Sequence, residues 1–369
     1  MASYRIVYLC ADLRRVGPTN QTLNIVKNAN EKLDDVLVLT LFEEPKNSIK
    51  NLFEQRNILC KSLSLKRNSF ILGFLRLFYF LKQNEVKLIH SYGVKPDILL
   101  FFVSKFFKIP YVLTQRCIPI EDYPFRMNKM VGCLIAQIHT FVLNHSKNVV
   151  ACSKYLCCEM KRRYNFKKIS YIQNGIDLEQ YKNNDKLEAR KILKINPKLV
   201  VFISTGLFLE RKHNDEIIDA YIRMKNDNSI LIMLGDGPLF EETRQKYISC
   251  KNVIFGGLCS NVPDYLAASD YFVSASDSEG LPNAVLEALA CGCPVILSDI
   301  PQHREILDEM PNCGRVFPLH NVNTLSTTMQ KCCSEKTEFD DTVTIIKKSP
   351  FTMREMGAKY KEYYKEILC

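Results

Sequence analysis

The chain of 369 residues is too long for one ordinary core and suits two domains. Its 47% hydrophobic and 24% charged residues are typical of a folded globular protein. Its formal net charge of +10 admits nucleic acid, an anionic membrane surface or a phosphorylated ligand as partners. We expect no nucleic acid, because zinc-finger spacing and RNA-binding aromatic motifs are absent from the sequence. Its 15 cysteines include no Cys-x-x-Cys pair, and no apolar run approaches about 20 residues, which argues against a disulfide scaffold and a membrane-spanning helix.

The first half alternates short apolar runs with longer amphipathic segments. The runs predicted as strands are residues 6–9, 36–41, 88–91, 111–114, 148–151 and 169–172. Strands spaced around helices in this way require crossover connections and predict a parallel sheet. The first apolar run is too short for a signal peptide and is interpreted as a strand, and the scattered cysteines are typical of core residues in a reducing cytoplasm, so we expect a cytoplasmic protein.

Three segments of the first half stand out. Residues 70–82 and 98–108 are apolar and basic together, and we interpret them as crossover helices that face the core. The alternative is that some Phe and Leu side chains stay exposed beside the basic residues and dock onto an acidic bilayer. Residues 116–130 contain Pro119 and Pro124, which predict an irregular, functional loop before a helix that runs to about Asn144.

The domain boundary is predicted after Asp177, where a turn-forming cluster precedes the polar stretch 179–197. The alternation then restarts, with strands predicted at 200–204, 230–234, 253–255, 271–274, 295–297 and 316–317. These predict a second parallel sheet. The expected domains are therefore 1–177 and 178–350, followed by a Lys- and Tyr-rich amphipathic helix within 351–369.

The stretch 274–298 combines a loop, a helix and a strand. Its turn precedes a helix predicted over 283–291, with Pro282 where helices begin. Gly280 lets a ligand approach the backbone, and the first helical amides are unpaired, so the loop predicts an anion site. Glu279 and Glu287 suit hydroxyl pairs such as those of a sugar ring or a ribose. The alternative is that both carboxylates only offset the helix dipole.

Ordered motifs in the second half carry a resemblance to a known family. They are GLFLERKH at 206–213, LGDGP at 234–238, VIFGG at 253–257, EGLPNAVLEALACGCPVI at 279–296 and SDIPQHREI at 298–306. In this order and spacing they resemble the retaining glycosyltransferases of family 4, and LIHSYG, IPYVLTQR and ISYIQNGID in the first half are softer matches. The resemblance implies an α/β glycosyltransferase-B fold, with two Rossmann-like domains whose parallel sheets face a central cleft. The N-terminal domain would bind the acceptor and the C-terminal domain the nucleotide sugar, with the last helix crossing back to the first domain.

The resemblance also implies roles for single residues. Lys212, with Arg211 as a second cation, would neutralise the donor diphosphate, on which negative charge develops as the sugar leaves. Glu279 would contact hydroxyls of the transferred sugar, and Glu287 would hold the ribose hydroxyls. The remaining donor contacts would come from Gly206, Gly280, Leu281 and Pro282 in the second domain and from Gly17 and Arg116 in the first. No metal or other cofactor is expected, because cations and a helix N-terminus replace it in that fold.

Some positions depart from the family pattern or keep two interpretations. Leu207 stands where many members carry Arg, and Thr114 begins Thr-Gln-Arg in place of Thr-x-His, which makes Arg116 a candidate for a different contact. His90 either packs in the core or lines the cleft. His303 either approaches the nucleotide or marks an exposed helix start.

The expected function is retaining transfer of a hexose or N-acetylhexosamine from a nucleotide sugar, with UDP as the expected nucleotide. The acceptor would be a hydroxyl of a lipid-linked or cell-surface glycan, as in O-antigen, capsule or exopolysaccharide assembly. The alternatives are an isomerase like UDP-N-acetylglucosamine 2-epimerase and a non-catalytic sugar-nucleotide-binding relative. In the bilayer interpretation above, the cytoplasmic protein would also lie peripherally on the anionic inner face of the cytoplasmic membrane.

Overall fold

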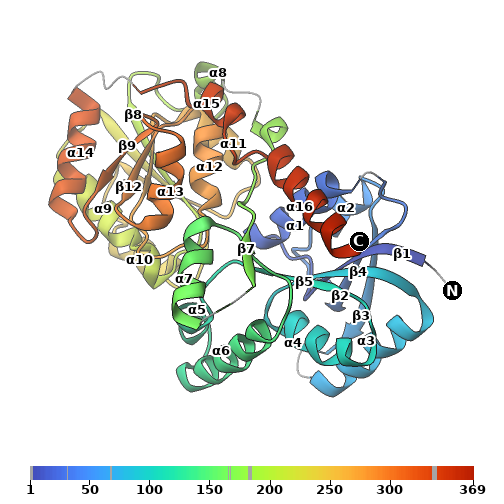
Figure 1. The fold of residues 1–369 in the computed structure, drawn as a ribbon. Helices are drawn as coiled ribbons and strands as arrows, with labels where there is room; N and C mark the ends of the chain where they lie inside the picture. The colour runs from blue at the N-terminus through green and yellow to red at the C-terminus, as the bar shows by residue number, and fades with distance from the viewer. Residues whose placement is uncertain are drawn as a thin grey trace. The chain divides into compact units, whose positions relative to one another are not determined.

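The computed structural model describes residues 3–30, 32–66, 69–164, 166, 168–181, 185–334 and 339–369. The chain divides into two compact units, one of Met1–Gly175 with Met353–Cys369 and the other of Ile176–Thr352 (Figure 1). The divisions lie at residues 175 and 352, whereas the sequence interpretation places them at 177 and 350.

The first unit is built on a parallel sheet of seven strands within the described residues, in the order β3-β2-β1-β4-β5-β6-β7. Its strands are β1 Ser3–Cys10, β2 Val36–Phe42, β3 Leu59–Leu65, β4 Glu85–Tyr92, β5 Tyr111–Gln115, β6 Val149–Ala151 and β7 Ile169–Tyr171. Its helices are α1 Gly17–Ala29, α2 Lys50–Glu54, α3 Phe70–Gln83, α4 Val94–Val103, η1 Ser104–Phe106, α5 Pro119–Arg126, α6 Lys129–Asn144, α7 Lys154–Tyr164 and α16 Met353–Leu368. The parallel sheet is confirmed, and β3 is a strand that the sequence interpretation missed.

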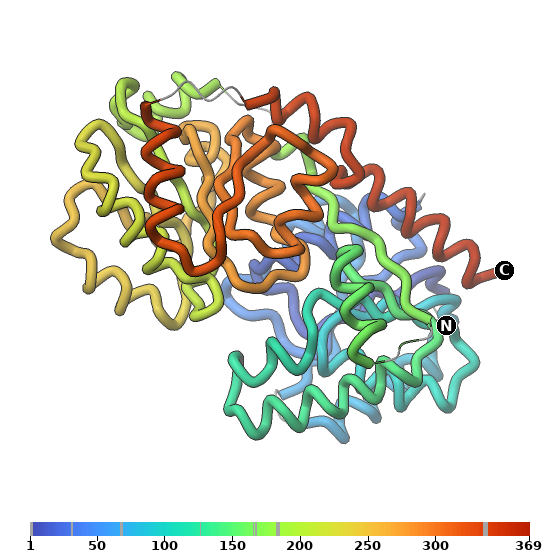
Figure 2. The backbone as a smooth tube through the Cα atoms, turned by 60° about the vertical axis from the view of Figure 1, so that its left-hand side comes forward, coloured from blue at the N-terminus to red at the C-terminus, as the bar shows by residue number. Residues whose placement is uncertain are grey.

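The last helix, α16, packs against α1 within this unit, as the views in Figures 1 and 2 both show. Ile6 and Tyr8 of β1 share one buried cluster with Val26 of α1 and with Met356 and Tyr360 of α16. The two helices approach closely at Gly357, where an added Cβ atom would lie only 2.3 Å from the Cβ of Asn28. The expectation that the last helix returns to the first domain is therefore confirmed.

The core-facing interpretation of residues 70–82 is wrong for most of α3. Of its residues, Gly73, Leu77 and Leu81 are buried, whereas Ile71 is 77% and Tyr79 60% exposed. The helix carries apolar residues all round but has neighbours on one side only, so its outer face stays in solvent. For residues 98–108 the interpretation holds as far as Val103, where the mostly buried α4 ends. It is wrong beyond that point, because Ser104–Phe106 form the short helix η1, in which no residue is buried and Phe106 is 66% exposed.

The irregular loop predicted at 116–130 is also wrong in part. Residues Pro119–Arg126 form helix α5, and Lys129–Asn144 form α6, which begins where Asn128 caps its first amides. Pro119 occupies the first turn, where no intrahelical hydrogen bond is lost, so it starts the helix. Pro124 lies inside a helix of eight residues and removes one backbone donor without preventing the helix.

The second unit has a parallel sheet of six strands in its described residues, in the order β10-β9-β8-β11-β12-β13. The strands are β8 Val200–Thr205, β9 Ser229–Leu234, β10 Val253–Gly257, β11 Tyr271–Ser274, β12 Val295–Ser298 and β13 Gly314–Phe317. The helices are η2 Leu178–Tyr181, α8 Lys186–Ile192, η3 Glu210–Lys212, α9 Asn214–Arg223, α10 Phe240–Lys246, α11 Val262–Ala268, α12 Asn283–Ala290, α13 Pro301–Glu309, α14 Val322–Ser334 and α15 Thr342–Lys348.

Helices α9 and α14 pack together against the second sheet. Ile218 of α9 and Met329 of α14 share one buried cluster with Phe202 of β8 and Val273 of β11. In each of the two parallel sheets, the carboxyl ends of the strands lie at the same edge of that sheet. Ligands bind at this edge in open α/β sheets. None of the helices in the described residues combines the length and apolar character that a bilayer crossing requires.

Candidate functional site

The loop between β11 and α12 begins and ends on buried residues. Ala275 is buried where the loop leaves the strand, and Leu281 is buried just before the helix. Pro282 is the N-cap of α12, with φ −75° and ψ 98°, and no described side chain caps the helix. The first amides and the positive end of the α12 dipole therefore lie beside Gly280 and Leu281, as an anion site requires.

Arg211, Lys212 and Glu279 form one ion-pair cluster in this unit. The Lys212 ammonium donates to Oε1 of Glu279. Nη1 of Arg211 lies 3.4 Å from Oε2 of Glu279 and donates to the carbonyl of Ser278 at 2.6 Å. The structure thus brings the two adjacent basic residues to the same carboxylate, although adjacent side chains need not point the same way.

The cluster fixes the charge of Glu279. Burial alone would raise the pKa of this carboxyl, but the cations of Lys212 and Arg211 outweigh burial and lower the pKa to about 2. The Glu279 side chain is 9% exposed and that of Lys212 20%. Glu279 is therefore ionised at neutral pH. A diphosphate that binds Lys212 must compete with the Glu279 carboxylate for the Lys212 ammonium.

Glu287 has the opposite electrostatic environment. Glu287 lies partly buried on α12 and makes a side-chain hydrogen bond with Tyr181 of η2. Burial raises the pKa of its carboxyl to about 7. The sequence interpretation missed Tyr181, which lies in the polar stretch after the domain boundary. Environments that separate the pKa values of two carboxyls are typical of functional sites.

Two glycine turns meet at the carboxyl ends of β8 and β9. Gly206 follows β8 with φ +140°, and a Cβ atom there would have no heavy atom within 4 Å. A Cβ atom at Gly235 would lie 1.7 Å from the carbonyl oxygen of Gly206, so the two turns touch through their backbones. Leu207, which replaces the Arg of the family pattern, is 48% exposed. The backbone at Gly206 is thus open to a ligand.

His303 is fully buried in α13, so the interpretation as an exposed helix start is wrong. Its Nδ1 lies 2.8 Å from the carbonyl of Ser298, to which it donates, and its Nε2 has no hydrogen-bond partner among the described residues. Burial lowers the pKa of His303 to about 4, although the hydrogen bond to the Ser298 backbone and the charge of Glu279 act in the opposite direction. The imidazole is therefore neutral at pH 7.

Gly17 and Arg116 belong to the first unit. Gly17 is the first residue of α1, whose N-terminus has no side-chain cap among the described residues. Arg116 follows β5, donates from Nη1 to Oδ1 of Asn174 at 2.9 Å, and lies 5.9 Å from the ring centroid of Tyr92. Its Nε and Nη2 are buried and lack a hydrogen-bond partner among the described residues. Arg116 therefore retains unused donors at the carboxyl edge of the first sheet.

His90 packs in the core and does not line a cleft within its unit. Its Nδ1 lies 2.6 Å from the hydroxyl of Tyr364 and its Nε2 lies 2.6 Å from Oγ1 of Thr114. Burial lowers the pKa of His90 to about 3. This neutral imidazole bridges α16 and β5 and adds to the packing of the last helix in the first unit.

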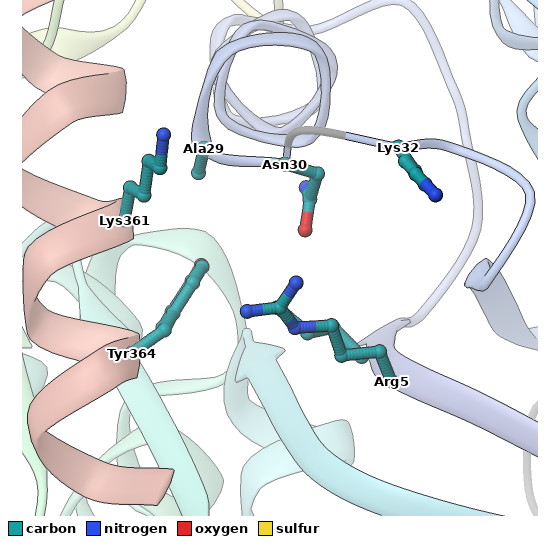
Figure 3. Close-up of a pocket in the computed structure, with 7 residues that line it drawn as sticks. Arg5, Ala29, Asn30, Lys32, Lys361 and Tyr364 are labelled. Atoms are coloured by element: carbon teal, nitrogen blue, oxygen red, sulfur yellow. The ribbon is translucent and has the colours of Figure 1, made fainter. Parts of the chain in front are cut away.

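A small pocket in the first unit lies away from the carboxyl edge of the sheet. Figure 3 shows Arg5 near the start of β1, with Tyr364 and Lys361 of α16 to the left of its guanidinium and Asn30 above it. It is lined mainly by basic and polar side chains. Because β1 enters the sheet there, this pocket is separate from the strand ends that carry Arg116.

Comparisons with known proteins address the family of this chain. The family profile described as "Glycosyltransferase Family 4" matches residues 17–180, and the profile described as "Glycosyl transferases group 1" matches residues 185–348. The O-antigen biosynthesis glycosyltransferase WclY of Escherichia coli is 25% identical over 377 residues, which cover 98% of each chain. The UDP-Gal:alpha-D-GlcNAc-diphosphoundecaprenol alpha-1,3-galactosyltransferase of Escherichia coli is 28% identical over 258 residues, covering 66% of this chain and 65% of that enzyme.

The fold has solved counterparts. The structure of Anabaena Alr3699/HepE in complex with UDP and glucose matches with a TM-score of 0.82 at 18% identity, covering 98% of this chain and 99% of that one. The predicted fold class, α/β with two parallel sheets as in the glycosyltransferase-B fold, is confirmed. The two profiles span most of both units, and the protein is a glycosyltransferase that belongs to family 4.

Proposed function

We propose that this protein transfers a hexose or N-acetylhexosamine, with retention, from a UDP-sugar to a hydroxyl of a lipid-linked or surface glycan. The observation that carries the proposal is the cluster of Arg211, Lys212 and Glu279 beside the uncapped N-terminus of α12. A cation pair, a carboxylate and free helical amides are the groups that a sugar diphosphate needs. The names of two relatives support a polyprenol-linked or O-antigen acceptor, and the complex of HepE with UDP and glucose supports UDP.

The site residues divide the donor between them. Lys212 and Arg211 stabilise the negative charge that develops on the diphosphate as the bond from the anomeric carbon to oxygen breaks. The amides of Gly280 and Leu281, at the positive end of α12, add to that stabilisation. Glu279 accepts hydrogen bonds from hydroxyls of the transferred sugar. The acceptor oxygen attacks the same face of the anomeric carbon, and the leaving phosphate takes the acceptor proton.

Two further residues, Glu287 in the second unit and Arg116 in the first, each have a substrate contact in this proposal. Glu287 accepts hydrogen bonds from the two ribose hydroxyls, for which its ionised form is the better acceptor. Arg116 offers Nε and Nη2 to an anionic oxygen of the substrate, in the place where family members carry His. A guanidinium binds such oxygens through two donors, whereas an imidazole offers one. This chemistry uses no metal and no cofactor beyond the donor.

Membrane attachment is a separate part of the proposal. The exposed face of α3 presents Ile71, Leu75 and Tyr79, and Phe106 of η1 is 66% exposed beside it. Basic residues accompany this apolar face, including the exposed Lys108. Apolar side chains flanked by basic ones bind anionic bilayers, where a lipid-linked acceptor would lie.

The transfer is tested by incubating UDP-sugars with a short-chain diphosphoprenol-linked N-acetylglucosamine and separating the products. Wild type should form a disaccharide whose anomeric configuration, read by NMR, matches that of the donor. Lys212→Met and Glu279→Gln should remove product. Lys246→Met, which breaks an exposed ion pair with Asp215, serves as the matched control and should retain it. An epimer formed without acceptor, or UDP binding without any product, would support the isomerase or the binding protein instead.

Membrane attachment is tested by sedimentation with vesicles that contain phosphatidylglycerol at low salt. Ile71→Asp should leave the protein in the supernatant. Ile248→Asp, at a site 65% exposed in the second unit, should sediment like wild type. Failure of wild type to sediment would remove this part of the proposal and leave the transfer reaction untouched.

A further inference from the structure

His213, Glu216 and His320 bring three metal-ligating side chains together at the surface of the second unit. His213 joins η3 to α9, Glu216 lies in the first turn of α9, and His320 lies in the loop between β13 and α14. Nδ1 of His213 is 3.3 Å and Nδ1 of His320 is 2.9 Å from the same oxygen, Oε1 of Glu216. The three ligand atoms lie within 4.8 Å of one another.

The two separations at Glu216 suit a small transition-metal ion. Zn²⁺ binds imidazole nitrogen and carboxylate oxygen at about 2.0–2.2 Å in tetrahedral geometry, which places neighbouring ligand atoms about 3.3 Å apart. The two nitrogen-to-oxygen distances at Glu216 are close to that value. Two imidazoles and one carboxylate form a common zinc ligand set that leaves a fourth position for water.

A second observation concerns the other nitrogen of His213. Its Nε2 lies 3.2 Å from Oδ2 of Asp277, so the ring stands between two carboxylates. Metal-ligating histidines characteristically donate their second ring N–H to a carboxylate, which fixes the ring and the tautomer. In the neutral tautomer of His213 in which Nε2 carries the proton, Nε2 donates it to Asp277, and the lone pair of Nδ1 faces the carboxylate of Glu216. Two acceptors that face each other are repulsive unless a proton or a cation lies between them.

The position is also open to an ion. The side chain of His320 is 51% exposed, whereas those of His213 and Glu216 are 22% and 21% exposed. The imidazole rings of His213 and His320 meet edge to face with centroids 4.6 Å apart, so both nitrogens approach Glu216 without either ring covering it. The ion would thus enter from solvent past His320.

We propose that His213, Glu216 and His320 bind a Zn²⁺ ion, with Asp277 orienting His213. The ion ties together η3, α9 and the loop before α14. His213 directly follows Lys212, and the backbone amide of Asp277 donates to the carbonyl of Arg211 at 3.0 Å. Bound zinc therefore stabilises the segment that carries both cations of the donor site. The ion takes no part in glycosyl transfer, and the proposal does not depend on the proposed function.

Titration of the metal-free, full-length protein with Co²⁺ tests the site, because cobalt reports its ligands in the visible spectrum. We expect one equivalent to bind with the absorption of a low-coordinate nitrogen and oxygen site and to be displaced by Zn²⁺. His320→Ala and Glu216→Gln should lose this signal, and Asp277→Asn should bind about tenfold more weakly. His145→Ala, which removes an exposed histidine of the first unit, is the matched control and should bind as wild type does.

A second measurement keeps the test independent of the spectrum. Zn²⁺ should raise the thermal unfolding temperature of wild type and of His145→Ala but not of His320→Ala, whose exposed side chain can be removed without loss of folding. Equal cobalt binding by wild type and His320→Ala would overturn the proposal. So would a strong thiolate charge-transfer band, which would assign the metal to exposed thiols such as Cys158.

Discussion

The proposed role of Glu287 links the pH dependence of stability to donor binding. Its pKa rises from 4.5 to about 7 because the carboxyl is buried, with a hydrogen bond to Tyr181 as its main polar contact. The folded protein therefore holds a proton that the unfolded chain has already released between these two pH values. Stability falls as pH rises from about 4.5 to about 7 through this residue, and the loss is complete above that range.

Glu287→Gln isolates this effect, because it keeps the size of the side chain and an acceptor for Tyr181 but cannot ionise. A pKa displacement of this size corresponds to about 3 kcal/mol. The free energy of unfolding of the variant relative to wild type should thus increase by up to about 3 kcal/mol between pH 5 and pH 8. Other titrating groups are common to both proteins and cancel in this comparison.

The same variant should bind the donor less well. At pH 8 the ionised carboxylate can accept two ribose hydroxyls, and hydrogen bonds to a charged group contribute about 1.5–3 kcal/mol each. We expect UDP to bind the variant at least about tenfold more weakly at pH 8, with a smaller difference at pH 5.5. Urea unfolding and calorimetry with UDP at both pH values measure the two effects. A stability difference that does not change with pH would refute the assigned environment of Glu287, and unchanged UDP affinity would refute its role.

Three further substitutions test the site and its support. Lys212→Met should lower the rate of donor cleavage by about 10² to 10³, measured as UDP release, whereas Lys246→Met should not. Tyr364→Phe leaves Nδ1 of the buried His90 without its partner and should destabilise the protein by about 1–3 kcal/mol in urea unfolding. Burial lowers the pKa of His303 to about 4, so its contribution is lost as pH falls from about 6.5 to about 4. His303→Gln should therefore lose less stability than wild type between pH 7 and pH 4.5.

Most strands could be predicted because buried parallel strands are continuous apolar runs. Val36–Phe42 is buried at every position, and its sequence, VLVLTLF, has a single polar residue. The missed strand, Leu59–Leu65, has the sequence LCKSLSL, lies at the sheet edge and is largely exposed. An edge strand needs no continuous apolar run, so its sequence does not distinguish it from a loop.

The site residues could be proposed from the sequence, but their contacts could not. Lys212 and Glu279 are separated by 67 positions, and nothing in either segment indicates that they form an ion pair. The pKa values of Glu279 and Glu287 depend on burial and on long-range partners such as Tyr181, which a linear pattern does not contain. The His213 cluster was missed for the same reason, since His320 lies 104 positions from Glu216.

The central claim is that the cluster of Lys212, Arg211 and Glu279 supports glycosyl transfer from a UDP-sugar. The most direct measurement is product formation from a panel of UDP-sugars with a diphosphoprenol-linked acceptor, run with wild type, Lys212→Met and Glu279→Gln. The account predicts one preferred donor, a product from wild type and a loss of at least about a hundredfold in both variants. Equal turnover by all three proteins would contradict it.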